Sequence, residues 1–418
     1  MSESTPSTSY VEYGTRPFRA ILLSLFLAGF AIFSSLYCVQ PMMPFLVQSF
    51  AVTPTQSSFP LSFSTIALAL GLIFAGLISD RYGRKSIMVV SLFSASTLLL
   101  LSSLLPIWSV FLATRMLIGL AVSGVASVAM TYIGEEIAAK DVGFAMGLYI
   151  SGTAIGGMGG RLIAGVLLDF STWQVATMLI ALINMAIAVV FYLALPASQH
   201  FKPSPISVFQ LKSSFKNNLA DPKLRLLFAQ GFILMGCFVS IYNYMSFHLL
   251  EEPYRLSQTW IGLISITYLS GIYSAPRAAA WSRKLGRPKV LLAMLLCMLL
   301  GVWIMQIASV VMVLIGLLIF TFSFFAAHST SSSWVSVQSL QYRAVGSSLY
   351  LFCYYLGSSA LGSASGLVWE SFGWFGIAIE ISLFLGLGLM VALKLKQLSV
   401  EDVEGVEKET APRTADER

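Results

Sequence analysis

Charged residues are scarce in this sequence. Asp, Glu, Lys and Arg together make up 11% of the 418 residues, whereas they make up about a quarter of a soluble domain. Hydrophobic residues reach 57% and are gathered into long runs, whereas helices of soluble proteins average about a dozen residues. This composition excludes a string of soluble domains and predicts a chain surrounded by a lipid bilayer.

Cysteine and histidine are too few and too scattered to suggest a metal site, a disulfide framework or an enzyme. The four cysteines lie inside apolar runs and show no CxxC spacing. The three histidines come with no convergent set of acids, bases or ligands. A GxxxxGK[ST] sequence for binding ATP is also lacking. We therefore expect no catalytic residues, no metal and no cofactor.

Twelve apolar runs are long enough to cross a bilayer core of about 30 Å, which takes about twenty helical residues. The first, 20–40, ends in Gln-Pro rather than in a small-residue cleavage site, so it reads as a retained span and not a signal peptide. The runs are 20–40, 59–78, 87–105, 109–133, 143–168 and 175–195, and then 226–248, 259–280, 290–308, 310–333, 346–369 and 375–395.

The distribution of basic residues predicts the orientation. The net charge of +6 comes from short clusters between the runs, which argues against a nucleic-acid partner. With both termini in the cytoplasm, only Arg255 falls in an outer loop and only Arg115 and Arg161 fall inside spans. The other 22 of the 25 Lys and Arg residues then lie on the cytoplasmic side, as the positive-inside rule requires.

An internal repeat divides the chain into two halves. Residues 147–173 match residues 348–374 at a constant offset of 201, including Gly156 with Gly357 and the acids Asp169 with Glu370. The segment SDRYGRK from Ser79 matches SRKLGRP at an offset of 203. We expect an all-α membrane protein of two six-helix pseudo-repeats. Its parts are a cytoplasmic leader 1–19, a bundle 20–195, a cytoplasmic linker 196–225, a bundle 226–396 and an acidic disordered tail 397–418.

The segment GLISDRYGRK, residues 76–85, resembles the loop signature G-x-L-x-D-R-x-G-R-[KR] of the major facilitator superfamily, with Ile78 as the one departure. Arg115 and Gly119 resemble its R-x-x-x-G element. The chain is especially similar to bacterial inner-membrane members placed near the twelve-helix drug:proton antiporters. The resemblance implies alternating access between halves around a midplane site.

The loop signature also has a physical interpretation. Gly83 can supply a tight turn, and Gly76 allows close approach of helices. Asp80 can act as a charged latch for Arg81, Arg84 or a helix N-terminus across the two halves. The alternative is that Arg81, Arg84 and Lys85 merely set the topology.

The fifth span has a face of small residues. Gly152, Gly156 and Gly160 recur every four residues, which lets helix backbones touch. The resemblance implies the antiporter motif G-x-x-x-G-P-x-x-G-G, but Gly157 replaces its proline and Arg161 replaces its last glycine. Helix packing and a coupling role both remain open for this face.

Ionisable residues inside the bilayer are functional candidates because they are costly there. They are Arg115, Arg161, His328 and Glu380. The resemblance implies that Arg115 faces the central cavity and is linked to proton movement, whereas snorkelling or pairing with an outer acid would make either arginine structural. His328 could relay protons or simply be a packed hydrogen bonder.

The first span contains no acid to hold a cationic drug, which favours neutral or anionic solutes. Aromatic and polar residues that could line the cavity are Tyr37, Tyr149, Tyr242, Asn243, Tyr268, Tyr350, Tyr354 and Tyr355. We expect a monomeric secondary transporter in the cell inner membrane that moves a small organic solute, with protons, by efflux. Proton-coupled uptake of an organic acid is the alternative direction, and a membrane sensor is the alternative class.

Overall fold

The computed structural model describes residues 10–201, 208–339 and 343–410. These residues form helices joined by short loops, and their one β-bridge joins Val11 to Ile137. The first half contains α1 (Arg16–Tyr37), α2 (Met43–Phe50), α3 (Pro54–Ser57), α4 (Phe59–Tyr82), α5 (Arg84–Leu104), α6 (Trp108–Glu136), α7 (Val142–Phe170) and α8 (Trp173–Ala194). The second half follows α9 (Val208–Ala220) and contains α10 (Pro222–Leu250), α11 (Gln258–Leu263), the 3₁₀ helix η1 (Ile264–Thr267), α12 (Tyr268–Leu285), α13 (Arg287–Ile304), α14 (Val310–Gln338) and α15 (Arg343–Thr410).

Ten helices of the described residues are long and apolar enough to cross a membrane. The last of them, α15, contains a break at Gly373, whose φ of 59° and ψ of −154° are not helical. Such a positive φ costs least at glycine. The expected span 259–280 is divided into α11, η1 and the start of α12, and α12 contains Pro276.

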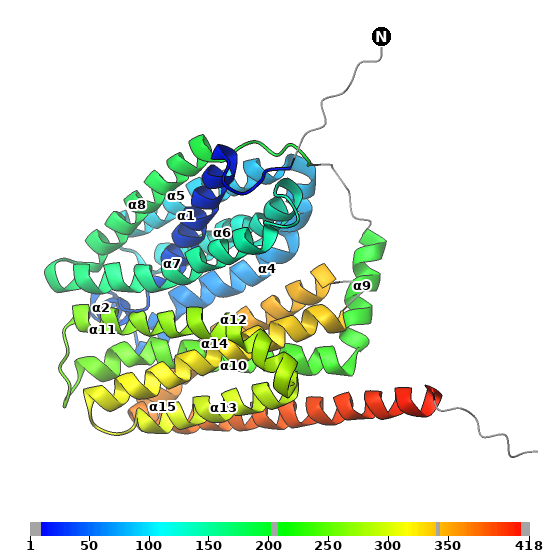
Figure 1. The fold of residues 1–418 in the computed structure, drawn as a ribbon. Helices are drawn as coiled ribbons and strands as arrows, with labels where there is room; N and C mark the ends of the chain where they lie inside the picture. Colours follow the sequence, from blue (N-terminus) through cyan, green and yellow to red (C-terminus); the bar gives the residue numbers. More distant parts are fainter. Residues whose placement is uncertain (1–9, 202–207, 340–342, 411–418) are drawn as a thin grey trace, which may run out of the picture.

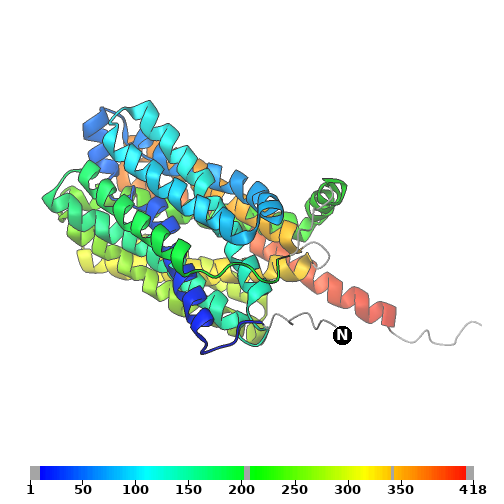
Figure 2. The same ribbon diagram turned by 90° about the horizontal axis from the view of Figure 1, so that it is seen from above.

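The two halves form two bundles that lie side by side, the first above the second in Figure 1. Within the first bundle α1 packs on α7, and α4 and α5 pack on α6. Within the second, α10 packs on α15, and α12 and α13 pack on α14. The helix α9 lies across one end of the molecule, beside the start of α15, in both views (Figures 1 and 2). We call this the linker end, and the opposite end, which carries α2, α3 and α11, the distal end.

Equivalent turns in the two halves have the same backbone conformation. Gly83, between α4 and α5, has a φ of 91°, and Gly286, between α12 and α13, has a φ of 84°. The tight turn predicted at Gly83 is therefore confirmed, and its counterpart 203 positions later adopts it too. The close approach predicted at Gly76 is wrong for this conformation, because a Cβ added there would meet open space.

The linker and the tail contain more helix than the sequence suggests. The segment 196–225 includes α9 and the first turn of α10, which Asp221 caps by accepting hydrogen bonds from the backbone of Lys223 and Leu224. The last helix continues to Thr410, past residue 397, where we expect the acidic tail to begin. Lys, Gln, Leu and Glu residues around 394–407 favour helix, and residues 411–418 lie outside the described part of the chain.

Candidate functional site

The halves meet along a seam of hydroxyl groups between α4 and α15. Ser363 hydrogen-bonds to Ser58 at 3.2 Å and to Ser62 at 2.6 Å. One turn further from the distal end, Ser359 bonds to Thr65 at 2.8 Å and donates to the carbonyl of Ser62 at 2.9 Å. Hydroxyl pairs of this kind hold helices together loosely, because each contributes about 1 kcal/mol.

Two carboxylates at the distal end each cap a helix of the other half. Asp169, at the end of α7, accepts hydrogen bonds from the backbone N–H groups of Gln258 and Thr259 at the start of α11, both at 2.9 Å. Glu370, in α15, accepts from the backbone N–H of Thr55 at 2.8 Å and from its hydroxyl at 2.7 Å. A carboxylate at a helix N-terminus is favourable because the unpaired N–H groups there carry partial positive charge.

A glycine four residues before each acid brings the capped segment close. A Cβ on Gly165 would lie 2.6 Å from the carbonyl oxygen of Gln258, and a Cβ on Gly366 would lie 2.5 Å from the Cα of Thr55. These two glycines are related by the offset of 201. The repeat therefore explains why both halves carry the same glycine and acid spacing at this end.

The side-chain hydrogen bonds that described residues make between the two halves lie between the middle of the molecule and the distal end. None of those bonds joins the two halves at the linker end. The halves are therefore closed against one another at the distal end.

Arg161 lies where the two halves meet. Its Nε donates to the side-chain oxygen of Gln40 at 2.5 Å, and its Nη1 donates to the carbonyl of Gly157 at 2.7 Å. Gln40 in turn donates to the side-chain oxygen of Asn243 at 2.6 Å, and Asn243 donates to the carbonyl of Gly362 at 3.2 Å. A chain of hydrogen bonds thus connects Arg161 to the second half.

Three tyrosines surround the guanidinium of Arg161, and we call them the tyrosine cage. The central carbon of the guanidinium lies 4.3 Å from the ring centre of Tyr37, 4.7 Å from that of Tyr268 and 5.4 Å from that of Tyr242. Cations within about 6 Å of an aromatic face are attracted by its quadrupole. Tyr37 comes from the first half and the other two come from the second, so the cage depends on how the halves are arranged.

Arg115 is buried inside the first half instead. Its guanidinium donates to the carbonyls of Ser35 at 2.7 Å, Leu36 at 2.6 Å and Pro60 at 3.5 Å. Ser35 and Leu36 belong to the last turn of α1, whose carbonyls lack partners within the helix. One turn further along α6, Gly119 lets this helix approach Ser64 of α4 closely. The hydroxyl of Ser64 donates to the backbone carbonyl of Arg115. The geometry supports a structural role for Arg115, which fixes α1, α4 and α6 together.

His328 belongs to an aromatic cluster of the second half. Its Nδ1 lies 3.0 Å from the hydroxyl of Tyr350, and its ring lies 4.5 Å from that of Tyr354 and 6.1 Å from that of Phe324, measured between ring centres. Tyr149 in α7 and Tyr355 in α15, two further predicted lining residues, are also buried. The predicted lining residues that join the Arg161 network are therefore Tyr37, Tyr242, Asn243 and Tyr268, whereas Tyr350 and Tyr354 join His328.

The glycine face of α7 packs on α1. A Cβ on Gly152, Gly156 or Gly160 would collide with the backbone of α1 at Phe26, Phe30 and Ser34 respectively. Gly357 is close to the carbonyl of Phe232 in the same way in the second half. Gly157 lies beside this face, and a Cβ there would be in ordinary contact with Arg161 and Tyr37. Close packing therefore accounts for Gly152, Gly156 and Gly160.

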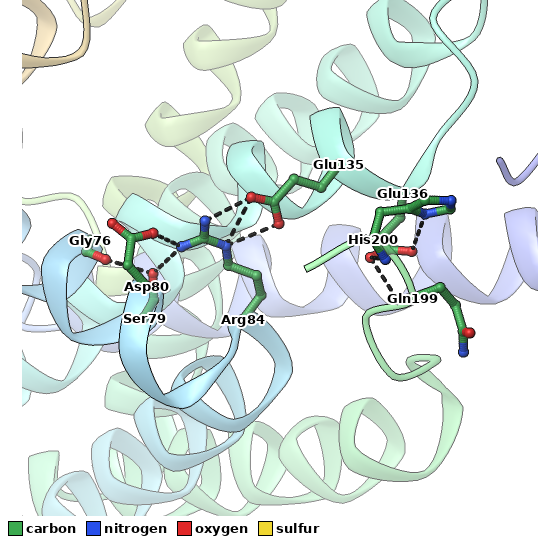
Figure 3. A network of polar contacts seen from close by, with 8 residues as sticks. All are labelled: Gly76, Ser79, Asp80, Arg84, Glu135, Glu136, Gln199 and His200. Atoms are coloured by element: carbon green, nitrogen blue, oxygen red, sulfur yellow. Dashed lines mark hydrogen bonds and ion pairs between the residues drawn. The ribbon is translucent and has the colours of Figure 1, made fainter. Parts of the chain in front are cut away.

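A charged cluster occupies the linker end of the first half (Figure 3). Arg84 donates to Asp80 at 2.5 Å, to the hydroxyl of Ser79 at 2.6 Å and to Glu135 of α6 at 2.7 Å. The predicted partnership of Asp80 with Arg84 is present, but within one half and not across the two. Arg81 is exposed and lies over the ring of Tyr82, and Lys85 donates to the carbonyl of Leu195 at the end of α8.

The neighbouring acid ties the linker to the same place. Glu136 is buried and accepts hydrogen bonds from the backbone N–H groups of Gln199 at 2.8 Å and His200 at 3.0 Å (Figure 3). The ring of His200 stacks on Tyr10 with ring centres 4.4 Å apart. The N-terminal leader and the start of the linker are therefore both attached to the end of α6.

Sequence reasoning missed Gln40 and Glu135. Gln40 could have been found as an amide at the end of an apolar run, and Glu135 as part of an acidic pair between basic loops. Among the described residues, no group of three or more His, Cys, Asp and Glu side chains could hold a metal ion.

Known sequences are similar to this chain along most of its length. A sequence model of the Major Facilitator Superfamily matches residues 25–363. The inner membrane transport protein YnfM of Escherichia coli (strain K12) is 45% identical over 386 residues, which cover 92% of this chain and 93% of YnfM. The uncharacterized MFS-type transporter YybF of Bacillus subtilis (strain 168) is 39% identical over 384 residues, which cover 92% of this chain and 95% of YybF.

Comparison with solved structures supports the fold. The structure of a bacterial homolog of the human lysosomal transporter Spinster, in an inward-facing and unoccupied conformation, superposes with a TM-score of 0.78. It covers 93% of this chain and 99% of that chain at 14% identity. At this identity the likeness extends to the fold alone.

Proposed function

The chain belongs to the Major Facilitator Superfamily, and from that premise we propose that it is a secondary active transporter that exports a small organic solute in exchange for protons by alternating access. The family's members and the YnfM relative are transporters and not enzymes, and the chain is a multi-pass protein of the inner membrane. Our proposal concerns the transport mechanism, the coupling ion and the direction of transport.

The helices of the structure are consistent with twelve membrane spans. Ten helices qualify by length and composition, with α15 counted once. Dividing α15 at Gly373 adds one span, and the α11–η1–α12 segment adds another, which makes twelve. The linker end is then the cytoplasmic end, because the basic loops around 81–85 and 283–289 fall on that side by the positive-inside rule.

The observation that carries the mechanism is the one-sided contact between the halves. Their hydrogen bonds among described residues are confined to the region between the Arg161 network and the distal caps. Hydrogen-bonded contact between the halves at one end only is what alternating access requires of a monomer built from two bundles. In this view the structure is the conformation open toward the cytoplasm.

The Arg84 cluster is our candidate for the gate at the cytoplasmic end. Here Arg84 forms ion pairs with both Asp80 and Glu135 within the first half. When the halves close at this end, the same charges would face the second half and could exchange partners with it. Charge-assisted hydrogen bonds are strong enough to make such an exchange a two-state event.

Transport by inverted membrane vesicles tests the direction and the coupling ion. We expect an acidic vesicle lumen to fill the vesicles with a transported solute, and an ionophore that collapses the proton gradient to stop the accumulation. Emptying of preloaded vesicles under the same gradient would support the reverse function, proton-coupled uptake of an organic acid. If none of the solutes in a broad panel is transported, the proposal is refuted.

A further inference from the structure

We propose that Arg161 binds the carboxylate group of a small organic anion at the junction of the two halves, an inference that rests on the transport function proposed above. The site consists of the Arg161 guanidinium, Gln40 and the tyrosine cage of Tyr37, Tyr242 and Tyr268. A positively charged site of this kind favours an anionic solute over a cationic one.

The positive charge of Arg161 is buried, and the described part of the chain provides no acid that compensates it. The residue is 3% exposed. Among the described residues no carboxylate forms an ion pair with it, although Arg84 has two such partners. Burying a charge without an opposite charge is unfavourable, and such residues inside membrane proteins mark substrate or ion sites.

One nitrogen of the guanidinium remains available. Nε and Nη1 donate to Gln40 and to Gly157, but Nη2 is buried and has no hydrogen-bond acceptor among the described residues. The hydroxyl of Tyr268 is close enough to interact with the guanidinium as a polar neighbour, yet no acceptor of the described residues meets hydrogen-bond geometry with Nη2. Arg115, the other arginine inside a predicted span, has acceptors for its guanidinium, because three carbonyls accept its hydrogen bonds.

A small cavity adjoins Arg161. Its lining includes Arg161, Tyr242, Met245, Ser246 and Ser265. Its volume is about 20 Å³, which holds about one water molecule. In this conformation the site can therefore accept no more than a small polar group, and the body of a solute requires the halves to move apart.

The Gln40 contact connects anion binding to the arrangement of the halves. The same amide that accepts from Arg161 donates to Asn243 of the second half at 2.6 Å. An anion that draws the guanidinium toward itself would change the Gln40 position and with it this inter-half hydrogen bond. The bound solute would thus influence which end of the transporter is closed.

Equilibrium binding to the purified full chain in lipid nanodiscs tests the proposal. The probes are acetate, benzoate and succinate, each compared with its neutral amide, acetamide, benzamide and succinamide. We expect at least one carboxylate to bind about tenfold or more tightly than its amide, as charge-assisted hydrogen bonds imply. The preference should disappear in Arg161→Gln and survive in Arg277→Gln, a matched control whose exposed guanidinium lies over the ring of Tyr273.

The variant Arg161→Lys provides a second test if Arg161→Gln does not fold. It keeps the charge but loses the planar fork, so the carboxylate should bind more weakly than to the wild type while still being preferred over its amide. Equal affinities for acid and amide in the wild-type protein, a preference that survives in Arg161→Gln, or unchanged affinity in Arg161→Lys would each overturn the proposal. Transport of a neutral solute with no carboxylate preference would refute this inference and leave the proposed function standing.

Discussion

Asp169 and Glu370 occupy equivalent positions 201 residues apart, and each caps a helix that belongs to the other half. The capped residues are also equivalent, since Thr55 and Gln258 are separated by 203 positions. The distal end is thus closed by two matching contacts between the halves. Each contact combines a carboxylate, helix N–H groups and a glycine that allows close approach.

Removing either cap should open the distal end. We expect Asp169→Ala and Glu370→Ala each to destabilise the closed arrangement by about 1 kcal/mol, as the loss of a helix cap does, which is roughly a fivefold change in the ratio of conformers. Alkylation of Ser363→Cys by a membrane-impermeant maleimide added at the distal side, with the four native cysteines replaced, measures this opening. Glu252→Ala is the control, because Glu252 is exposed and pairs with Arg255 within its own loop. Equal alkylation rates in all four proteins would contradict the prediction.

Replacing Arg84 should destabilise the first bundle. Arg84→Ala leaves Asp80 and Glu135 close together without their shared cation, and breaking such a partly buried network costs about 2 to 3 kcal/mol. Thermal unfolding in detergent, followed by tryptophan fluorescence, should show a lower midpoint. Arg81→Ala removes the same charge from an exposed neighbouring position, so its midpoint should stay close to that of the wild type. A midpoint for Arg84→Ala that equals that of Arg81→Ala would refute this role.

Adding a methyl group to the close helix contacts should be equally harmful in both halves. In Gly156→Ala and Gly357→Ala the new Cβ collides with the carbonyl oxygens of Phe30 and Phe232, and overpacking of this kind costs about 1 to 3 kcal/mol. The loss of stability is measured by size-exclusion chromatography, as the fraction of protein that still elutes as a single species after heating. Gly147→Ala is the control on α7, since its Cβ meets open space. Comparable losses in Gly147→Ala would show that helix contact is not the cause.

Changing Arg115 should affect stability. In Arg115→Lys a single ammonium group replaces a planar guanidinium that donates to Ser35, Leu36 and Pro60. We expect a loss of about 1 to 3 kcal/mol from carbonyls left without donors, seen as a lower unfolding midpoint. Arg277→Lys, at an exposed position, should not change the midpoint. An unchanged midpoint for Arg115→Lys together with lost transport would instead favour the coupling role that the family resemblance implies.

Some parts of the site could be predicted because they depend on local sequence. The turn at Gly83, the pairing of Asp80 with a nearby arginine and the packing face of α7 follow from spacing along one helix or loop. Other parts depend on segments that are distant in sequence. Gln40 and Arg161 are separated by 121 positions, and Glu135 lies 51 positions from Arg84, so no periodicity indicates that they touch.

The sequence by itself determined that this protein is a helical membrane transporter of two related halves, because the lipid solvent requires long apolar helices and the duplication preserves residue spacing. Only the tertiary structure decided which buried arginine serves the structure and which remains available. Arg115 and Arg161 look alike as single charges in apolar runs. Their roles separate because carbonyls of α1 and α4 surround the first, whereas tyrosines from both halves surround the second and leave Nη2 without an acceptor among the described residues.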